Sequence, residues 1–223
     1  MYGIEISCQF HNVNTVVYGK VRGNRLSPAE WVNAGLKTLA KTGFAILKAD
    51  TLANTLGVSR GSFYWHFADV AAFHAAILRR WREIALENII EEIDGSADDR
   101  LEALLYRAFS AAGSDTERAV RAWATADRHA RAAVEAVDAE RLRYLRKLLI
   151  ESGVDPNLAE PRARILNWCY LGFALSPSRP DPETVQHTVA DLSQLARSTR
   201  GQRPTRRFAA GRPRRRGAKQ RAK

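Results

Sequence analysis

The sequence has little of what cross-links small proteins or holds metal ions. It contains two cysteines, Cys8 and Cys169, and no Cys/His cluster with the spacing of a zinc site. The longest apolar run, from Trp168 to Leu175, is far too short to cross a bilayer, and the N-terminal residues lack the charged-then-apolar layout of a signal peptide. These absences argue against a disulfide scaffold. They predict a soluble cytoplasmic protein with no metal, no other cofactor and no membrane partner.

Catalytic motifs are also missing. The chain has no Gly-x-Ser-x-Gly elbow, no phosphate-binding glycine loop, no His-Glu-x-x-His and no dinucleotide fingerprint. Folding could still assemble a Ser/His/Asp set, but no spacing in the sequence indicates one. We therefore predict that the protein is not an enzyme and has no catalytic residues.

Acidic residues are absent from the C-terminal end of the chain. Residues 200–223 carry 11 Lys/Arg and no Asp/Glu, and residues 20–82 carry ten Lys/Arg against three Asp/Glu. Residues 83–199 are acidic, with 14 basic residues against 20 acidic ones. Because a polyanion attracts the two basic segments and repels the acidic one, contact with DNA is expected near the ends of the chain.

Strand signals are scarce, whereas apolar residues recur at helical spacing along most of the chain. Start and stop signals such as Ser27-Pro28, Asp69 and Gly153 separate the helical segments. The sequence therefore predicts an all-α protein of about nine helices, and it contains no internal repeat.

Residues 48–67 have the pattern of two short helices joined by a tight turn. Leu52 and Leu56 lie on one apolar face, and Gly57 can adopt the left-handed conformation that the turn requires. Ser59 is expected to cap the second helix through its hydroxyl. This pattern is typical of a helix-turn-helix that reads DNA.

The segment Leu52–Phe67 resembles the DNA-binding signature of the tetracycline-repressor (TetR/AcrR) family. The close resemblance covers roughly residues 26–82. Farther on it is weaker, and the segments Glu117–Ala124 and Arg141–Leu145 resemble one branch of the family. The resemblance implies an N-terminal three-helix DNA-binding domain, followed by a helical bundle that binds a ligand and dimerises.

Four segments are predicted along the chain. The DNA-binding domain is expected at residues 24–70 and the helical ligand-binding and dimerisation domain at residues 71–199. Residues 1–23 are either a flexible arm or the product of a mis-assigned start codon. Residues 200–223 cannot bury enough apolar surface to fold and are predicted to be a disordered basic tail. Within it Gly211–Pro213 resembles the core of an AT-hook, so the tail is either a minor-groove element or a sequence-blind tether to polyanions.

The second helix of the motif, residues 59–67, is expected to lie in the major groove. Arg60 can donate two hydrogen bonds to guanine, and Ser62 can reach a neighbouring base edge. The resemblance implies that Tyr64, His66 and Lys48 bind backbone phosphates. The predicted DNA-binding residues are Lys48, Ser59, Arg60, Gly61, Ser62, Tyr64, Trp65 and His66. The alternative for the aromatic members, Trp65 above all, is a place in the core.

One recognition helix reads too few base pairs for useful specificity, so a two-fold dimer on a near-palindrome is expected. The dimer interface is predicted on the last two helices, with Leu166, Tyr170, Phe173, Val185, Val189 and Leu192, unless these residues close their own core. The resemblance also implies a small-molecule pocket in the bundle that re-spaces the DNA-binding heads. Its candidate lining residues are Tyr106, Phe109, Trp123, His129, Trp168 and Cys169, which core packing would equally explain.

These features predict a sequence-specific transcriptional regulator, namely a ligand-responsive repressor that binds a near-palindromic operator as a homodimer. Its expected partners are double-stranded DNA, a second copy of the chain and a small-molecule inducer. The resemblance implies the bacterial cytoplasm as its location, with the nucleoid as its site when bound to DNA. The alternative is a largely sequence-blind nucleoid or architectural protein whose binding is driven by the basic tail.

Overall fold

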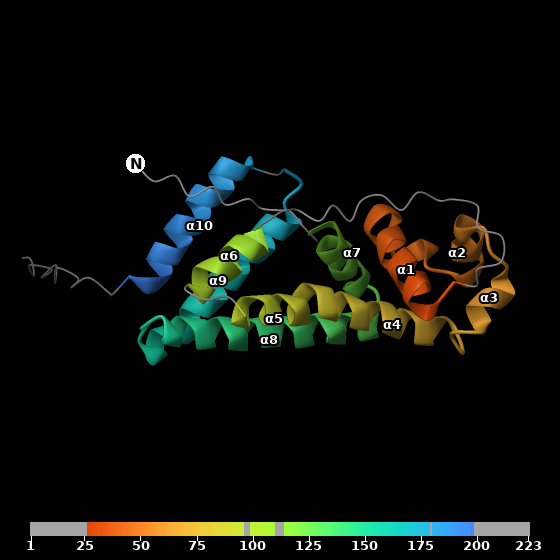
Figure 1. The fold of residues 1–223 in the computed structure, drawn as a ribbon, viewed down its shortest axis with the longest axis horizontal. Coiled ribbons are helices and arrows are strands. Elements are labelled where there is room, and N and C mark those ends of the chain that lie inside the picture. The colour runs from red at the N-terminus through yellow and green to blue at the C-terminus, as the bar shows by residue number, and fades with distance from the viewer. Residues whose placement is uncertain (1–25, 96–98, 110–113, 179, 199–223) are drawn as a thin grey trace, which may run out of the picture. The chain divides into compact units, whose positions relative to one another are not determined.

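The computed structural model describes residues 26–95, 99–109, 114–178 and 180–198, and within these ranges the chain is helical and contains no strand. This confirms the predicted all-α fold class. The helices are α1 (Pro28–Thr42), α2 (Ala49–Leu56), α3 (Arg60–Tyr64), α4 (Val70–Arg82), α5 (Asn88–Asp94), α6 (Arg100–Phe109), α7 (Ser114–Ala124), α8 (Arg128–Glu151), α9 (Pro156–Leu175) and α10 (Pro182–Arg197) (Figure 1). The predicted N-terminal arm and basic tail lie outside the described residues.

Two short irregular elements complete the list of helical segments. A 3-10 turn, η1 (Phe44–Ile46), follows α1, and a π-helical turn, η2 (Glu83–Glu87), joins α4 to α5. Because α4, η2 and α5 follow one another without a gap, they form one continuous helical stretch. Counted in this way, the described part of the chain has nine helices, in agreement with the predicted number.

Capping side chains start several helices where the sequence placed them. Ser27 and Glu30 form a reciprocal capping box at the start of α1, and Asp69 accepts the Ala72 backbone N–H at 2.7 Å at the start of α4. The prediction that the Ser59 hydroxyl caps α3 is wrong. Ser59 occupies the N-cap position of α3, but the Ser62 N–H donates to the Ser59 backbone carbonyl at 3.0 Å, so the hydroxyl is not used as a cap.

The described residues form two compact units. The first unit contains residues 26–85 and 114–135, and the second contains residues 86–95, 99–109, 136–178 and 180–198. Helix α7 therefore groups with the N-terminal helices, a feature that the sequence did not indicate. The domain boundary expected between residues 70 and 71 stays a prediction.

Aromatic rings form the centre of the first unit. Trp31 of α1 and Phe63 of α3 pack edge to face at 5.5 Å between ring centroids, and Phe63 lies 5.1 Å from Phe73 of α4. All three side chains are fully buried. Helix α7 joins this unit through Trp123, whose ring stacks on Phe44 at 4.6 Å. The rings thus fix α3 against α1 and α4, which positions the outward side chains of α3.

Aliphatic side chains dominate the core of the second unit. The core residues contributed by α6, α8, α9 and α10 include Leu101, Leu105, Phe109, Leu145, Leu148, Leu149, Leu166 and Val189. Figure 1 shows α6, α9 and α10 side by side in this unit. In the part of the chain described here, no helix combines the length and apolarity needed to cross a membrane.

Candidate nucleic-acid interface

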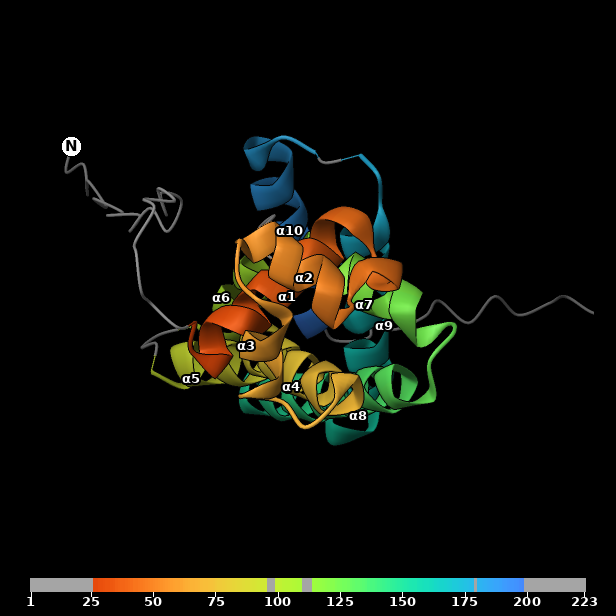
Figure 2. The same cartoon turned by 90° about the vertical axis from the view of Figure 1, so that its right-hand side faces the viewer.

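The helix-turn-helix consists of α2, a tight turn and α3, which face the viewer in Figure 2. Gly57 ends α2 in the left-handed conformation (φ 68°), as the sequence predicted. Helix α3 is shorter than expected, since regular geometry ends at Tyr64. Beyond it the chain tightens, and the His66 N–H donates to the Phe63 carbonyl at 3.0 Å. Phe63 and Phe67 are buried and anchor both ends of this segment.

Most of the predicted DNA-binding residues lie on the surface of the α2–α3 segment. Trp65 is 73% exposed and Tyr64 is 44% exposed, so Trp65 is not a core residue. Lys48, Ser59, Arg60 and Gly61 are exposed as well, whereas Ser62 and His66 are partly buried. The Nε2 atom of His66 is buried without a hydrogen-bond partner in the described structure. A phosphate contact from His66 therefore requires its Nδ1 atom or a turned ring.

Arg60 is held by two neighbours. Its Nε lies 3.0 Å from Oδ1 of Asp50 on α2, and its Nη2 lies 3.4 Å from the Tyr64 hydroxyl oxygen. The guanidinium carbon also lies 5.6 Å from the centre of the Tyr64 ring. The hydrogen bond to Tyr64 and, second, the Asp50 charge raise the pKa of Arg60 above its ordinary value. Arg60 is therefore a permanent, oriented cation on the head, the name used here for the DNA-binding domain predicted at residues 24–70.

The six candidate pocket residues are divided between the two units. Trp123 and His129 belong to the first unit, where Trp123 is buried against Phe44 and His129 is exposed. In the second unit, Tyr106 and Trp168 are 59% and 65% exposed. Phe109 is buried in the core, and Cys169 is partly buried against it. The structure thus places Phe109 and Trp123 in packed cores, which is the alternative that the sequence left open.

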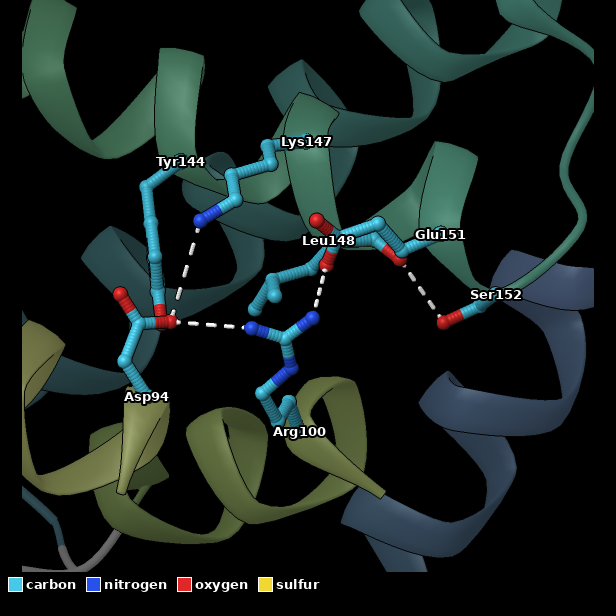
Figure 3. A network of polar contacts seen from close by, with 7 residues as sticks. All are labelled: Asp94, Arg100, Tyr144, Lys147, Leu148, Glu151 and Ser152. Atoms are coloured by element: carbon cyan, nitrogen blue, oxygen red, sulfur yellow. Dashed lines mark hydrogen bonds and ion pairs between the residues drawn. The ribbon is translucent and has the colours of Figure 1, made fainter. Parts of the chain in front are cut away.

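A polar cleft in the second unit contains none of those six residues. Its volume is about 350 Å³, and it is lined by Asp99, Arg100, Leu101, Leu148, Glu151, Ser152 and Arg197. Arg100 bridges Asp94 at 3.2 Å and Glu151 at 2.5 Å (Figure 3). Burial, followed by the hydrogen bond to Asp94, raises the pKa of Tyr144 beside this network. The members of this cluster come from α5, α6 and α8, so no local spacing in the sequence indicated it.

The predicted dimer residues divide into two groups. Leu166 and Val189 are buried in the core of their own unit. The other four, Tyr170, Phe173, Val185 and Leu192, are partly buried against that core. Both groups therefore serve the protomer's own packing.

Helix α9 has an exposed, mostly apolar stripe that was not predicted from the sequence. It consists of Pro161, Ile165, Trp168, Gly172 and Leu175, which follow one another at intervals of four, three, four and three residues. This is the spacing at which one helix face meets another helix. The same spacing, read along the sequence from Pro161, is the signal that could have identified the stripe.

The α2–turn–α3 segment has the geometry of a helix-turn-helix. Residues 32–77 match the family model of bacterial regulatory proteins, tetR family. The resemblance to the tetracycline-repressor family is thereby confirmed in the DNA-binding segment.

Solved structures share the fold beyond that segment, over 77% to 79% of this chain. A TetR-family transcriptional regulator from Rhodococcus sp. is 19% identical, with a TM-score of 0.62 over 77% of this chain and 98% of the regulator. A transcriptional regulator from Rhodococcus sp. Rha1 is 21% identical, with a TM-score of 0.65 over 77% and 96%. The fatty acid degradation regulator FadR from Bacillus halodurans is 16% identical, with a TM-score of 0.58 over 79% and 96%. No curated protein matches the sequence.

Proposed function

We propose that the protein is a sequence-specific transcriptional regulator that binds a near-palindromic operator as a homodimer and represses transcription there. The observation that carries this proposal lies inside the segment that matches the family model. There α3 turns Phe63 into the core while Arg60, Tyr64 and Trp65 stay on the surface. A short rigid helix with outward cationic and aromatic side chains is suited to the major groove.

The proposed contacts fall into two classes. Arg60 donates to guanine N7 and O6, and Ser62 reaches a neighbouring base edge, so these two residues supply sequence preference. Lys48, Tyr64 and His66 bind phosphates and set the register of the head. Trp65 packs on a sugar or a thymine methyl group. Ser59 and Gly61 lie where the backbone comes close to DNA.

The exposed stripe on α9 supports the dimer. Trp168 and Ile165 are large apolar side chains on the surface, and a Cβ added at Gly172 would meet nothing within 4 Å, so a partner helix can approach there. A second copy of the chain presents the same stripe, and a two-fold axis can pair the two stripes. We therefore assign the interface to this face of α9 and not to the buried Leu166.

Regulation by a small molecule is the remaining part of the proposal, and its support is the family resemblance. A compound that stabilises one spacing of the two heads would lower operator affinity. The same compound would raise the unfolding temperature of the free protein, because it binds the folded state. A screen by thermal unfolding, followed by operator titration, tests this part independently of DNA recognition.

A sequence-blind architectural protein is the less favoured function. Non-specific binding needs only charge, whereas the head has a shaped turn at Gly57 and a packed support beneath Phe63. These features are expected of a protein that reads sequence.

Two substitutions test the proposed roles on a DNA site enriched from a random pool. Arg60→Ala should change the preferred bases, because it removes a base contact. Lys48→Ala should weaken binding to DNA of every sequence alike and reduce the slope of log K against log salt by about one. If Arg60→Ala weakened binding to all DNA sequences equally, α3 would not read bases and the proposal would fail.

A further inference from the structure

One carboxylate occupies an unusual place on the head. Residues 20–82 contain three acidic residues, and two of them, Glu30 and Asp69, accept hydrogen bonds at the starts of their own helices. The third, Asp50, lies in the first turn of α2 with its side chain 62% exposed, and it reaches across to Arg60 of α3. A carboxylate beside the DNA-facing surface repels phosphates, so its presence there lowers general affinity for DNA.

The geometry of the Arg60 guanidinium shows what this carboxylate does. Nε lies 3.0 Å from Asp50 Oδ1 and Nη2 lies 3.4 Å from the Tyr64 hydroxyl oxygen. Nε and Nη2 form one edge of the planar group, and that edge is turned to the protein. The end of the group, which has the Nη1 hydrogens and the outer Nη2 hydrogen, is left to donate. That end presents the parallel pair of donors that matches guanine N7 and O6.

Tyr64 completes the arrangement. Its hydroxyl oxygen accepts from Arg60, so its own O–H remains available to donate to a phosphate oxygen. Asp50 contributes an ion pair with Arg60, and Tyr64 contributes a hydrogen bond. The three residues thus form a row from Asp50 through Arg60 to Tyr64 along the proposed DNA-binding surface.

We propose that Asp50 is a specificity-determining residue, which orients Arg60 toward a guanine and disfavours binding to phosphates at the same place. The inference rests on the proposed function, since it requires α3 in the major groove. Fixing the guanidinium before binding removes an entropic cost from guanine recognition. The ion pair with Asp50 also holds Arg60 back from phosphates. Both effects act through Arg60 and widen the gap between operator affinity and affinity for other DNA.

The experiment compares affinity for the enriched site with affinity for unrelated DNA of equal length at one salt concentration. In the Asp50→Ala variant, affinity for unrelated DNA should rise, and the ratio between the two affinities should fall about tenfold. The preference at one guanine should relax in parallel. The matched control is Asp69→Asn, which removes one negative charge from the same head and keeps a capping residue. It should raise both affinities alike and leave the ratio unchanged.

Arg60→Ala supplies the coupling test. Adding Asp50→Ala to Arg60→Ala should leave the ratio where the single Arg60 variant puts it, because Asp50 acts through Arg60. Thermal unfolding of each variant verifies that the head is folded. An unchanged ratio in folded Asp50→Ala overturns this inference while the proposed function stands. A wild-type protein that binds both DNAs equally overturns the proposed function itself.

Discussion

Gly61 is the residue at which the backbone of α3 is open to the surface. A Cβ added there would meet only Ser59 Oγ, at 3.8 Å, so the folded protein has room for a methyl group. Gly35 is the opposite case, because its Cβ would lie 2.7 Å from Ile77 Cδ1 and 2.8 Å from Phe73 Cζ. The glycine at position 35 is therefore explained by packing of α1 on α4. The fold offers no such explanation for the glycine at position 61.

We predict that Gly61→Ala leaves the protein folded and weakens its binding to DNA. Alanine in a helix stabilises by about 0.5–1 kcal/mol relative to glycine, so the free energy of unfolding should rise slightly. The added methyl group would separate the backbone from DNA, and operator affinity should fall about tenfold, the effect of one lost close contact. Urea unfolding and fluorescence titration measure the two quantities. Unchanged operator affinity would show that the backbone at Gly61 does not approach DNA.

The α2–turn–α3 element was predictable because its signals are local. The left-handed Gly57 of this element and the N-cap Asp69 of the following helix, α4, each follow from a few neighbouring residues, and the structure has both as predicted. The unused hydroxyl of Ser59 was not predictable, since a backbone carbonyl competes for the same N–H. The stacking of Trp123 on Phe44 was missed too. It joins distant parts of the chain, and periodicity identifies only which face of a helix is buried.

In the second unit, the sequence did not indicate a contact between the start of α6 and the end of α10. Asp99 caps α6 by accepting the Glu102 N–H at 3.0 Å and also pairs with Arg197 of α10 at 2.5 Å. Partial burial acts to raise the pKa of Asp99. The hydrogen bonds from Glu102 and from Arg197 act against it, and the pKa is lowered overall. The folded state therefore favours the charged carboxylate.

The lowered pKa gives a pH dependence with a definite sign. The stability that Asp99 contributes is fully present above the ordinary aspartate pKa of about 4 and is lost as the pH falls through the lower folded-state value. Asp99→Asn keeps a capping residue and removes the charge. The variant should be less stable than wild type at pH 7, by less than about 1 kcal/mol because the pair is partly exposed. Urea unfolding at pH 7 and pH 3 should show the difference shrinking in acid. A difference independent of pH would contradict the assigned role of the charge.

For the whole molecule, we propose that two chains pair through the exposed stripe of α9. Sequence periodicity selected apolar residues of α9 and α10 but could not tell which of them the protomer's own core would use. The structure makes that distinction, since Leu166 is buried and Trp168 is 65% exposed. Chemistry alone cannot separate a buried leucine from an exposed tryptophan, because both are apolar residues on one helix.

We predict that Trp168→Glu yields a folded monomer. A buried, unpaired carboxylate at the centre of the stripe would oppose association, whereas the protomer loses little packing because Trp168 is exposed. The matched control is Tyr106→Glu, which places the same charge at another exposed aromatic residue, on α6. Sedimentation should give a monomer for the first variant and a dimer for the second. A dimeric Trp168→Glu variant would place the interface elsewhere.

Selection of bound DNA from a random pool, at one moderate salt concentration, tests whether the helix-turn-helix reads DNA sequence. The full-length chain and a chain ending at Thr199 are compared. If the helix-turn-helix supplies specificity, both should enrich the same near-palindrome. The shorter chain should bind every sequence more weakly and with a smaller salt dependence, because it lacks 11 positive charges. If the shorter chain enriches no sequence, the basic segment is the main DNA-binding element, and the proposed role of the head is wrong.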